Sequence, residues 1–504
     1  MTGSKFNFPK YILIIFCCFF TIKSIIVPWT FFISASFRMD FYDLGLISDF
    51  LANTAKGKTF FVDTYDISHL SLHWTPTLFL LVPFFKFFES QFLTVILGNI
   101  IGCFSIIYFL TFIYRKILSK FTNKLFLISS TIFLSLLFFS NKFINANFVA
   151  GHFEIIYFSF SLLTLTMLLE NRSFLTISIP LILALGVRED MGLFLSFQLL
   201  SLLFIPKNII PLEKKTKFNI LYMIILCTIV VILNLTVFMP LMRADKAYWI
   251  NRFWSHWGNS GSEIIFNVLT HPIEVIKALI NSGMTGFNEA FFYLGIFNPL
   301  QWICVHIPGT ILFLSNATDK NNLFWYNSAM MLPGFYIASI VGMLVMYNFI
   351  RNKIPKYEYI FSGLLILISI ILLVRINRAS NSEDYKLKYN NKLENFDKVL
   401  IYINKYCKKE PQIFATDHKT FSFLPNSKTK YLLDKFEKAE VVIIGTPENF
   451  EFVSDRCDNN IENENCLINY NNSFEKITQN SDFKLLYQDK YYQAFYDSIK
   501  IDCK

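Results

Sequence analysis

Long runs of apolar residues recur along this chain of 504 residues and constrain its fold more than any other feature. Several runs approach or exceed roughly 18 residues, the length at which an apolar helix can cross a bilayer. Hydrophobic residues make up 54% of the sequence and charged residues only 16%, whereas soluble domains carry about 25% charged residues. The sequence therefore predicts an all-α polytopic membrane bundle and excludes an ordinary soluble protein.

The first apolar run, Tyr11–Ile33, follows Lys5 and Lys10. We expect an uncleaved span there rather than a signal peptide, because the run is long and many others follow it. Lys23 inside this run is expected to snorkel or to face protein. The further apolar runs are 77–88, 92–114, 125–140, 155–169, 174–187, 191–205, 218–239, 290–300, 301–314, 329–350 and 357–374. The run 77–88 is short and interrupted by proline, so we expect it at the membrane surface, which leaves about eleven spans.

Basic residues between the runs indicate which loops face the cytoplasm. If the N-terminus is inside, the short outer loops hold Lys142, Arg188 and Lys320. The cytoplasmic loops then hold a much larger set: Arg115, Lys116, Lys120, Lys124, Arg172, Lys207, Lys214, Lys215, Lys217, Arg351, Lys353 and Lys356. This asymmetry predicts a protein of the inner (plasma) membrane with a cytoplasmic N-terminus. It also accounts for the net charge of +9 without a nucleic-acid partner.

The same topology places three long polar segments outside, namely 34–75, 241–289 and everything after residue 375. We therefore predict a membrane domain over residues 1–375 and a soluble extracytoplasmic domain over residues 376–504. Strands predicted at 412–415, 441–445 and 484–496 and a helix at 395–406 make the second a small α/β domain. Its four cysteines can form disulfides outside the cell, with Cys457 and Cys466 the easiest pair to close. The other five cysteines lie in apolar runs and are expected to pack there.

Acidic residues are concentrated in the first outer segment, which carries Asp40, Asp43, Asp49, Asp63, Asp66, His69 and His73. Asp40 and Asp43 are three residues apart directly after the first span. Burial and mutual repulsion at that place would raise the pKa of one carboxyl and make it a usable base. The alternative is that Asp43 only caps a helix that begins at Leu44.

Charged residues also lie between apolar runs at the predicted outer boundary. Arg188, Glu189 and Asp190 occupy a tight turn there. Charges so close to hydrocarbon usually pair or line a site, and arginine binds phosphate well, so the choice is between a binding site and an internally paired turn. His152 and Glu154 lie on the same side, but two such residues are too few to indicate a metal site.

The second outer segment carries aromatic and basic residues together, among them Trp254. Such rings either stack on sugars or rest at the lipid headgroups, and anchoring in the headgroup layer is the commoner role. The sequence contains no G-x-x-x-x-G-K-[ST], G-x-G-x-x-G, H-E-x-x-H or G-x-S-x-G motif. Nucleotide cofactors and the common hydrolase designs therefore have no support.

The order of these motifs resembles a family of membrane proteins, DUF2079. Residues 43–45, then 52–58, then His73-Trp-Thr-Pro76 resemble the opening of that family. Residues 151–154 stand where the family tends to have Phe-His-Pro-Glu, and residues 188–190 resemble its Lys-Glu-Asp. Residues 326–329 resemble its Tyr-Ser-Ala, and residues 439–444 fit a strand of its tail domain. This chain departs from the pattern at Phe153, where the family has proline, and at Arg188, where it has lysine.

The family is in turn similar to the GT-C glycosyltransferases, membrane enzymes that use polyprenyl-phosphate-linked sugars. The resemblance implies transfer of a sugar from such a donor to an unknown glycan, lipid or protein acceptor on the outer face. It implies Asp43 as the base and Arg188 as the group that binds the phosphate. It further implies that Glu189 and Asp190 orient Arg188 or the acceptor, and that Asp40, His73, His152, Glu154 and Trp254 belong to the binding site. Asp43 and Glu154 could together hold a divalent cation, but their spacing in the sequence does not require one.

Two other classes of function stay open from the sequence. A lipid or sugar-lipid flippase can use the same polar groups as substrate ligands, but transporters more often carry mid-membrane charges and repeated halves. A membrane scaffold or sensor can act through the C-terminal domain, but it leaves the acidic first outer segment without a role.

Overall fold

The computed structural model describes residues 8–33, 41–62, 67–87, 91–150, 152–242, 254–295, 298–316, 323, 325–381, 391–407, 413–415, 429–431, 439–445, 475–489 and 492–503. The chain forms two compact units. The first comprises Met1–Pro28, Leu70–Leu78 and Val95–Lys386, and the second comprises Trp29–His69, Phe79–Thr94 and Leu387–Lys504.

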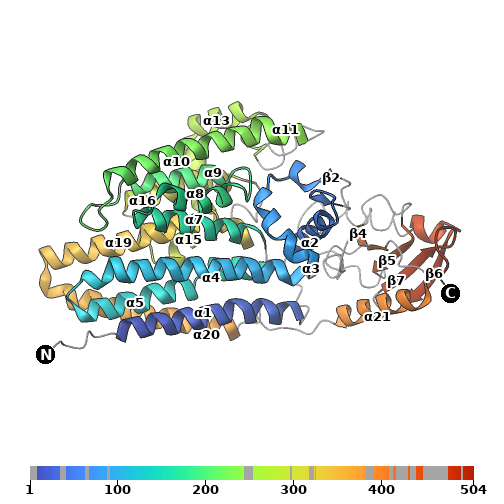
Figure 1. Ribbon diagram of the computed structural model, residues 1–504, viewed down its shortest axis with the longest axis horizontal. Coiled ribbons are helices and arrows are strands. Elements are labelled where there is room, and N and C mark those ends of the chain that lie inside the picture. Colours follow the sequence, from blue (N-terminus) through green and yellow to red (C-terminus); the bar gives the residue numbers. More distant parts are fainter. Residues whose placement is uncertain are drawn as a thin grey trace. The chain divides into compact units, whose positions relative to one another are not determined.

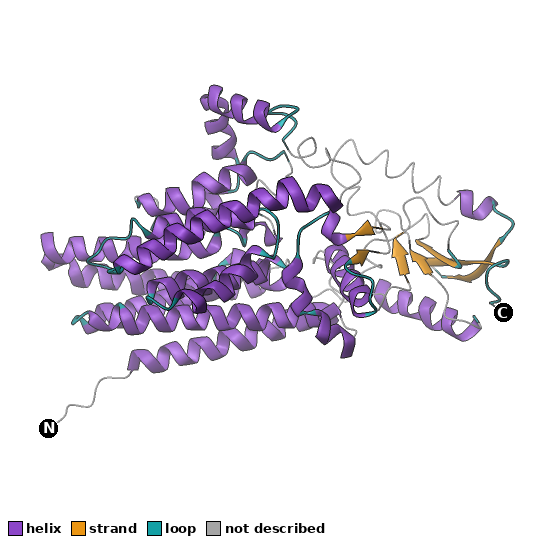
Figure 2. Cartoon of the chain, turned by 45° about the horizontal axis from the view of Figure 1, so that its top comes forward, coloured by secondary structure: helices purple, strands orange, loops and turns teal. Residues whose placement is uncertain are grey.

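The first unit is built from helices (Figures 1 and 2). In chain order they are α1 (Phe8–Ile33), α4 (Gln91–Lys116), α5 (Lys124–Phe139), α6 (Lys142–Ala150), α7 (Glu154–Leu169), α8 (Phe174–Leu185), α9 (Met191–Leu202), α10 (Lys214–Leu233), α11 (Met239–Met242), α13 (Gly261–Thr270), α14 (Pro272–Asn281), α15 (Met284–Ala290), α16 (Pro299–Gln301), α17 (Ile307–Phe313), α19 (Leu332–Lys353) and α20 (Glu358–Asn381). Two π-helical turns interrupt this series, at Asn234–Phe238 and at Trp302–His306.

Among the described residues, four helical segments are long and apolar enough to cross a membrane. The bent helix pair Lys124–Phe138 and Lys142–Phe148 gives a fifth span among these residues if the pair counts as one. The four are Val95–Lys120, Lys214–Met242, Leu332–Lys353 and Pro355–Leu372. Four shorter apolar helices, Glu154–Leu169, Phe174–Leu185, Met191–Leu202 and Pro299–Phe313, accompany them. The helical membrane class is thus confirmed, while the number of about eleven spans stays a prediction.

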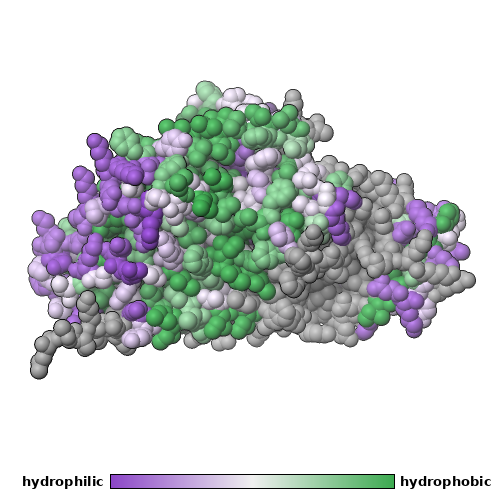
Figure 3. All heavy atoms as spheres, in the orientation of Figure 1, coloured by the Kyte–Doolittle hydropathy of each residue, from purple (hydrophilic) through white to green (hydrophobic). Residues whose placement is uncertain are grey.

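The loops predicted to face the cytoplasm lie together at one end of the helices. Three side-chain pairs join them or the helix ends next to them: Asn123–Glu358 (2.8 Å), Asn171–Thr216 (2.6 Å) and Tyr108–Glu170. Figure 3 shows hydrophilic side chains gathered at one end of this unit, whereas the surface along the helices is mainly hydrophobic. The positive charges that predict a cytoplasmic side therefore share one side of the structure.

The span predicted over 290–300 is wrong. α15 ends at Ala290, and the chain then makes a turn in which Phe292 and Tyr293 both adopt a φ of 54°. Residues in this left-handed region cannot continue a right-handed helix. Asn298 is extended before Pro299, which begins the next helical segment, because a residue before proline is biased away from helical angles. Apolar composition alone did not reveal this break.

The segment 241–289, which is predicted to lie outside, contains α13, α14 and all but the last residue of α15, three helices that the sequence did not predict. Within α1, the amine of Lys23 donates a hydrogen bond to Asn145 of α6 (3.2 Å), so Lys23 faces protein rather than lipid. The cysteines of the apolar runs are free thiols, and three of them are buried: Cys103, Cys227 and Cys304.

The second unit begins with α2 (Phe41–Ala55), the short hairpin of β1 (Phe61–Val62) and β2 (Ile67–Ser68), and α3 (Val82–Phe87). Because α2 begins at Phe41, Asp43 is its third residue and not the cap of a helix that starts at Leu44. The run expected at the membrane surface, 77–88, corresponds to a 3₁₀ turn over Pro76–Leu80 followed by α3.

The C-terminal part of this unit is a five-stranded sheet with the order β4-β3-β5-β7-β6 and helix α21 (Asn391–Tyr406). β3 (Ile413–Ala415) is parallel to β4 (Thr429–Tyr431) and to β5 (Val441–Gly445). The single strand predicted over 484–496 is an antiparallel hairpin of β6 (Phe483–Gln488) and β7 (Tyr492–Asp497). The turn residues between them interrupt the alternation of apolar and polar side chains.

A disulfide joins Cys407, at the end of α21, to Cys503 near the end of the chain. Val399, Ile403 and Cys407 follow one another at helical spacing and pack into one buried cluster with the sheet. The pair that the sequence favours, Cys457 and Cys466, lies outside the described residues. A disulfide is nevertheless present in the part of the chain where the sequence predicts oxidising surroundings.

Candidate functional site

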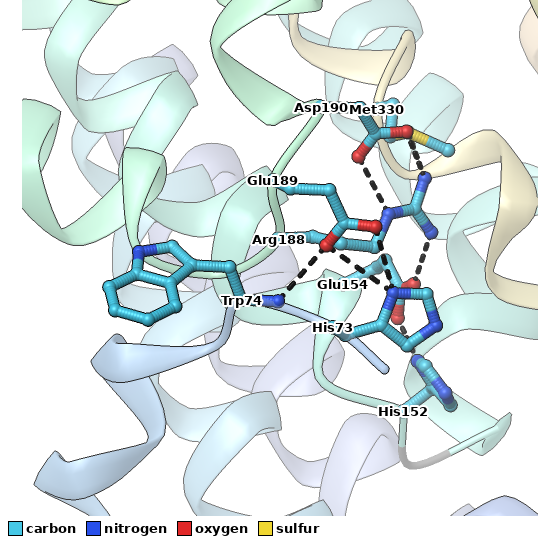
Figure 4. A network of polar contacts seen from close by, with 8 residues as sticks. All are labelled: His73, Trp74, His152, Glu154, Arg188, Glu189, Asp190 and Met330. Carbon is cyan, nitrogen blue, oxygen red and sulfur yellow. Dashed lines mark hydrogen bonds and ion pairs between the residues drawn. The ribbon is translucent and has the colours of Figure 1, made fainter. Parts of the chain in front are cut away.

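Three segments of the first unit bring charged side chains together (Figure 4). Glu154 is the first residue of α7, residues 188–190 form the turn between α8 and α9, and His73 lies just before the turn at Pro76. Glu170 follows the last residue of α7 and contacts Tyr108 at the end that carries the basic loops. A helix of 16 residues is about 24 Å long. The cluster therefore lies at the opposite end of α7 from the predicted cytoplasmic loops.

Arg188 is the centre of this cluster. Its Nε and one Nη donate to the two carboxylate oxygens of Asp190 at 2.7 and 2.8 Å, and the other Nη donates to Glu154 Oε1 at 2.8 Å. The guanidinium also contacts the sulfur of Met330 at 3.0 Å. A bidentate arginine pair with charged hydrogen bonds is among the stronger polar contacts in proteins. Arg188 therefore ties the turn to the start of α7.

His73 and Glu189 form a second pair beside the first. His73 Nδ1 lies 3.0 Å from Glu189 Oε1, and the backbone N–H of Trp74 donates to Glu189 Oε2 at 3.1 Å. Burial by itself raises the pKa of Glu189, but the charge of His73, its hydrogen bond and the charge of Arg188 outweigh burial and lower that pKa to about 2. Glu189 is consequently a carboxylate at neutral pH and holds the ring of His73 in one orientation.

The segment that carries His73 is attached to the turn through main-chain contacts. The N–H of Thr77 donates to the carbonyl of Gly186 at 2.8 Å, and its hydroxyl donates to the carbonyl of Leu183 at 2.7 Å. A Cβ on Gly186 would lie 2.4 Å from the Thr77 hydroxyl oxygen. Glycine is therefore required at residue 186 for this close approach.

Two more polar contacts complete the surroundings. His152 Nδ1 forms a hydrogen bond with Glu154 Oε2, and Arg188 donates to Glu154 Oε1, so both carboxylate oxygens of Glu154 have partners. Asn147 Nδ2 donates to the hydroxyl of Ser328 at 2.9 Å, which brings residues 326–329 toward the segment 147–154. Four motifs that are separate in the sequence, around residues 73, 152, 188 and 328, thus meet in space.

Solvent exposure changes across the cluster. Glu154 is completely buried, the side chains of Arg188 and Glu189 are 11% and 12% exposed, and those of His73 and Asp190 are 26% and 35% exposed. The buried members are held by ion pairs that cost free energy to break. His73 and Asp190 are the side chains that a ligand can reach, so the open side of the site is defined by them.

The described residues do not contain a group of three or more His, Cys, Asp or Glu side chains placed to hold a metal ion. The cluster's three carboxylates are each bonded to a cation or a histidine, as given above. Its chemistry is that of fixed charges next to a histidine whose orientation is set by a carboxylate.

The sequence predicted six members of the cluster, and the structure brings all six together: His73, His152, Glu154, Arg188, Glu189 and Asp190. Asp43 belongs to the other unit, where it lies in α2, and its side chain is outside the described residues, as is Asp40. The indole of Trp254 donates to the carbonyl of Ile311 at 2.9 Å, so the structure places Trp254 against α17.

Three contributors were missed by the sequence analysis. They are the backbone N–H of Trp74, the hydroxyl and N–H of Thr77, and the sulfur of Met330. Trp74 is the second residue of the motif His73-Trp-Thr-Pro76, Thr77 follows that motif, and Met330 follows the motif 326–329. Membership of those motifs, or proximity to them, was the available signal.

The helices and the cluster define an integral membrane protein with an ionic site at one end of its helical unit. The family DUF2079, described as a predicted membrane protein, matches residues 34–436. The chain belongs to this family.

No curated protein matches the sequence. Among solved structures, ArnT from Cupriavidus metallidurans bound to undecaprenyl phosphate is similar, with a TM-score of 0.46 and 10% sequence identity, and the match covers 95% of this chain and 97% of that chain.

Proposed function

We propose that this protein is a membrane glycosyltransferase of the GT-C type, which transfers a sugar from a polyprenyl-phosphate-linked donor to an acceptor on the outer face of the membrane. The observation that carries the proposal is the convergence of four separate motifs into one partly exposed ionic site, described above (Figure 4). The family's resemblance to GT-C enzymes supports the same assignment.

The chemistry of such a transfer suits the residues present. A lipid-linked phosphate is already a competent leaving group, so the enzyme needs one base to accept the proton of the acceptor hydroxyl and cations to stabilise the departing phosphate. No nucleotide takes part, which agrees with the absence of nucleotide-binding motifs from the sequence. The site supplies cationic groups through Arg188 and, when protonated, the two histidines.

Asp43 is the proposed base, and His73, His152 and Glu154 line the proposed donor site, with Asp40 and Trp254 as further binding residues. Arg188 already donates to two carboxylates, so it binds a phosphate only by exchanging one of them. Asp190 is the more exposed of the two partners. We therefore propose that the donor phosphate replaces Asp190 on Arg188, which frees Asp190 to orient the acceptor.

The proposed orientation places the N-terminus in the cytoplasm and the domain 376–504 outside. Two observations support it: the loops rich in basic residues share one end of the helices, opposite to the ionic site, and the C-terminal part contains the disulfide Cys407–Cys503. Disulfides persist in oxidising compartments and are rare in the cytosol.

The test is a comparison of lipid-linked sugars and surface glycans by mass spectrometry in a deletion strain. The strain is complemented with wild type, Asp43→Asn, Glu189→Gln or Glu170→Gln at matched expression. Glu170 is the matched control, because its side chain is also 12% exposed and is also paired with a basic residue, Arg172 in place of His73, but it lies at the other end of α7.

The proposal expects the deletion to remove a sugar from the surface and to accumulate its lipid-linked donor. Wild type and Glu170→Gln should restore the glycan, whereas Asp43→Asn and Glu189→Gln should not. Full rescue by Asp43→Asn would reject Asp43 as the base. A deletion that changes no glycan would reject the transferase and leave transport or scaffolding, and a lipid-linked sugar that collects on the inner face only would favour a flippase.

A further inference from the structure

A large apolar groove lies between α1 and α4 in the first unit. Its volume is about 930 Å³, close to the upper end of the roughly 300–1,000 Å³ typical of ligand pockets. Leu13, Ile14 and Ile22 of α1 and Ile107 of α4 line it. The ionic site described above contributes no residue to this groove, so the groove is a separate feature.

One end of the groove is positively charged. Lys10 at the start of α1 and Arg115 at the end of α4 both line it, together with Tyr114. Both cations are exposed, and neither forms an ion pair with any residue in the described part of the chain. Two cations at the mouth of an apolar groove, with no ion-pair partner among the described residues, are complementary to a ligand with an anionic head and an apolar tail.

The length of the groove indicates how deep such a ligand reaches. From Lys10 to Ile22 the groove follows twelve residues of α1, which is about 18 Å of helix. Half of a hydrocarbon core about 30 Å thick is about 15 Å. The groove therefore extends from one membrane interface to about the middle of the bilayer, the depth of one leaflet.

The charged mouth lies at the end of the helices opposite to the ionic site, because Arg115 ends α4 beside the basic loops. The occupant of the groove is therefore a lipid of the leaflet on the side of Lys10. The distribution of basic residues makes this the cytoplasmic leaflet, which is rich in anionic lipids.

We propose that the groove between α1 and α4 is a binding site for one anionic phospholipid of that leaflet. The phosphate lies between Lys10 and Arg115, and an acyl chain follows the apolar wall toward Ile22. This site is independent of the proposed glycosyltransferase activity.

The test is native mass spectrometry of the full-length protein, released from detergent with defined lipid added. We expect one phosphatidylglycerol to stay bound in preference to phosphatidylcholine. Each basic residue near an anionic surface contributes about 1 kcal/mol, so the double variant Lys10→Gln/Arg115→Gln should bind phosphatidylglycerol about 30-fold more weakly. The control is Arg351→Gln/Lys353→Gln, which removes one arginine and one lysine from the same end of the helices, where both are exposed.

A second variant tests the groove without changing charge. Thr111 also lines the groove, and Thr111→Trp should fill it and displace the acyl chain while both cations remain. The proposal is overturned if the double variant retains phosphatidylglycerol, if the control pair loses as much, or if Thr111→Trp binds the lipid as well as wild type does. Preferential retention of added polyprenyl phosphate over phosphatidylglycerol would equally overturn it.

Discussion

Replacing Glu189 by glutamine removes one negative charge from the ionic site and keeps the size of the side chain. In the wild-type protein, Glu189 accepts from the Trp74 N–H and pairs with His73. Glutamine can still accept from that N–H, but it offers no charge to His73 or Arg188. The variant therefore isolates the electrostatic contribution of a carboxylate that is 12% exposed.

The size of the effect follows from the pKa of Glu189, which the surrounding charges lower from its usual 4.5 to about 2. At roughly 1.4 kcal/mol for each pKa unit, the ionised form of Glu189 stabilises the folded protein by about 3 kcal/mol when it is paired with a protonated His73. Because the folded-state pKa is lowered, this contribution is complete above about pH 4.5 and is lost as the pH falls toward 2.

The assay is thermal unfolding of the purified protein in detergent, followed by intrinsic fluorescence at a fixed scan rate between pH 7 and pH 3. At pH 7 we expect Glu189→Gln to be less stable than wild type by up to about 3 kcal/mol. The difference between their Tm values should shrink below about pH 4.5, because wild-type Glu189 then becomes protonated and loses its advantage.

A double-mutant comparison with His73→Gln makes the cause testable. His73 is the foremost of the groups that lower the pKa of Glu189, so Glu189→Gln should cost clearly less in the His73→Gln background. A constant difference in Tm from pH 7 to pH 3, or an equal cost in both backgrounds, would refute the electrostatic reasoning.

Further changes test other parts of the structure. Gly186→Ala should lower the Tm by several degrees, because the new Cβ meets the hydroxyl that faces it at 2.4 Å, whereas the same change at Gly363, which has nothing within 4 Å, should not. Arg188→Gln leaves a buried carboxylate without its cation, so we expect a loss of about 3–5 kcal/mol in unfolding free energy and no rescue of the deletion strain. The disulfide between Cys407 and Cys503 joins residues that are 96 positions apart in the sequence. Cys503→Ser should therefore destabilise the C-terminal part by about 4–5 kcal/mol, which thermal unfolding would measure. Without a reducing agent, maleimide should label neither Cys407 nor Cys503 in the wild-type protein.

Several features of the protein could be predicted from short stretches of sequence. An apolar helix is stable in lipid because its backbone N–H and C=O groups form hydrogen bonds with one another within the segment. Most helices, such as α4 and α19, therefore lie where the sequence has apolar runs. The helix α21 and the strand β5 likewise follow local patterns. The break after Ala290 was not predictable from apolar content, because backbone angles at two apolar residues decide it.

For the candidate site, too, some features could be predicted from the sequence and others could not. The charged residues that form it could be picked out by type, because ionisable groups beside hydrocarbon rarely lack a role. Their partners could not, since Arg188 meets Glu154 across 34 residues and His73 meets Glu189 across 116. The sequence also did not predict that Arg188 already donates hydrogen bonds to two carboxylates. For this reason we propose that a donor phosphate binds Arg188 only by replacing Asp190.

Membrane class, the segregation of basic loops and the identity of the charged candidates were thus determined by the sequence alone. These properties depend on composition within one segment, and hydrocarbon imposes the same requirement on every segment that enters it. The tertiary structure decided which carboxylate each cation holds, how open each side chain is, and that Lys10 and Arg115 share the mouth of one groove. Such properties depend on contacts between distant segments, and only the packing of the helices determines those contacts.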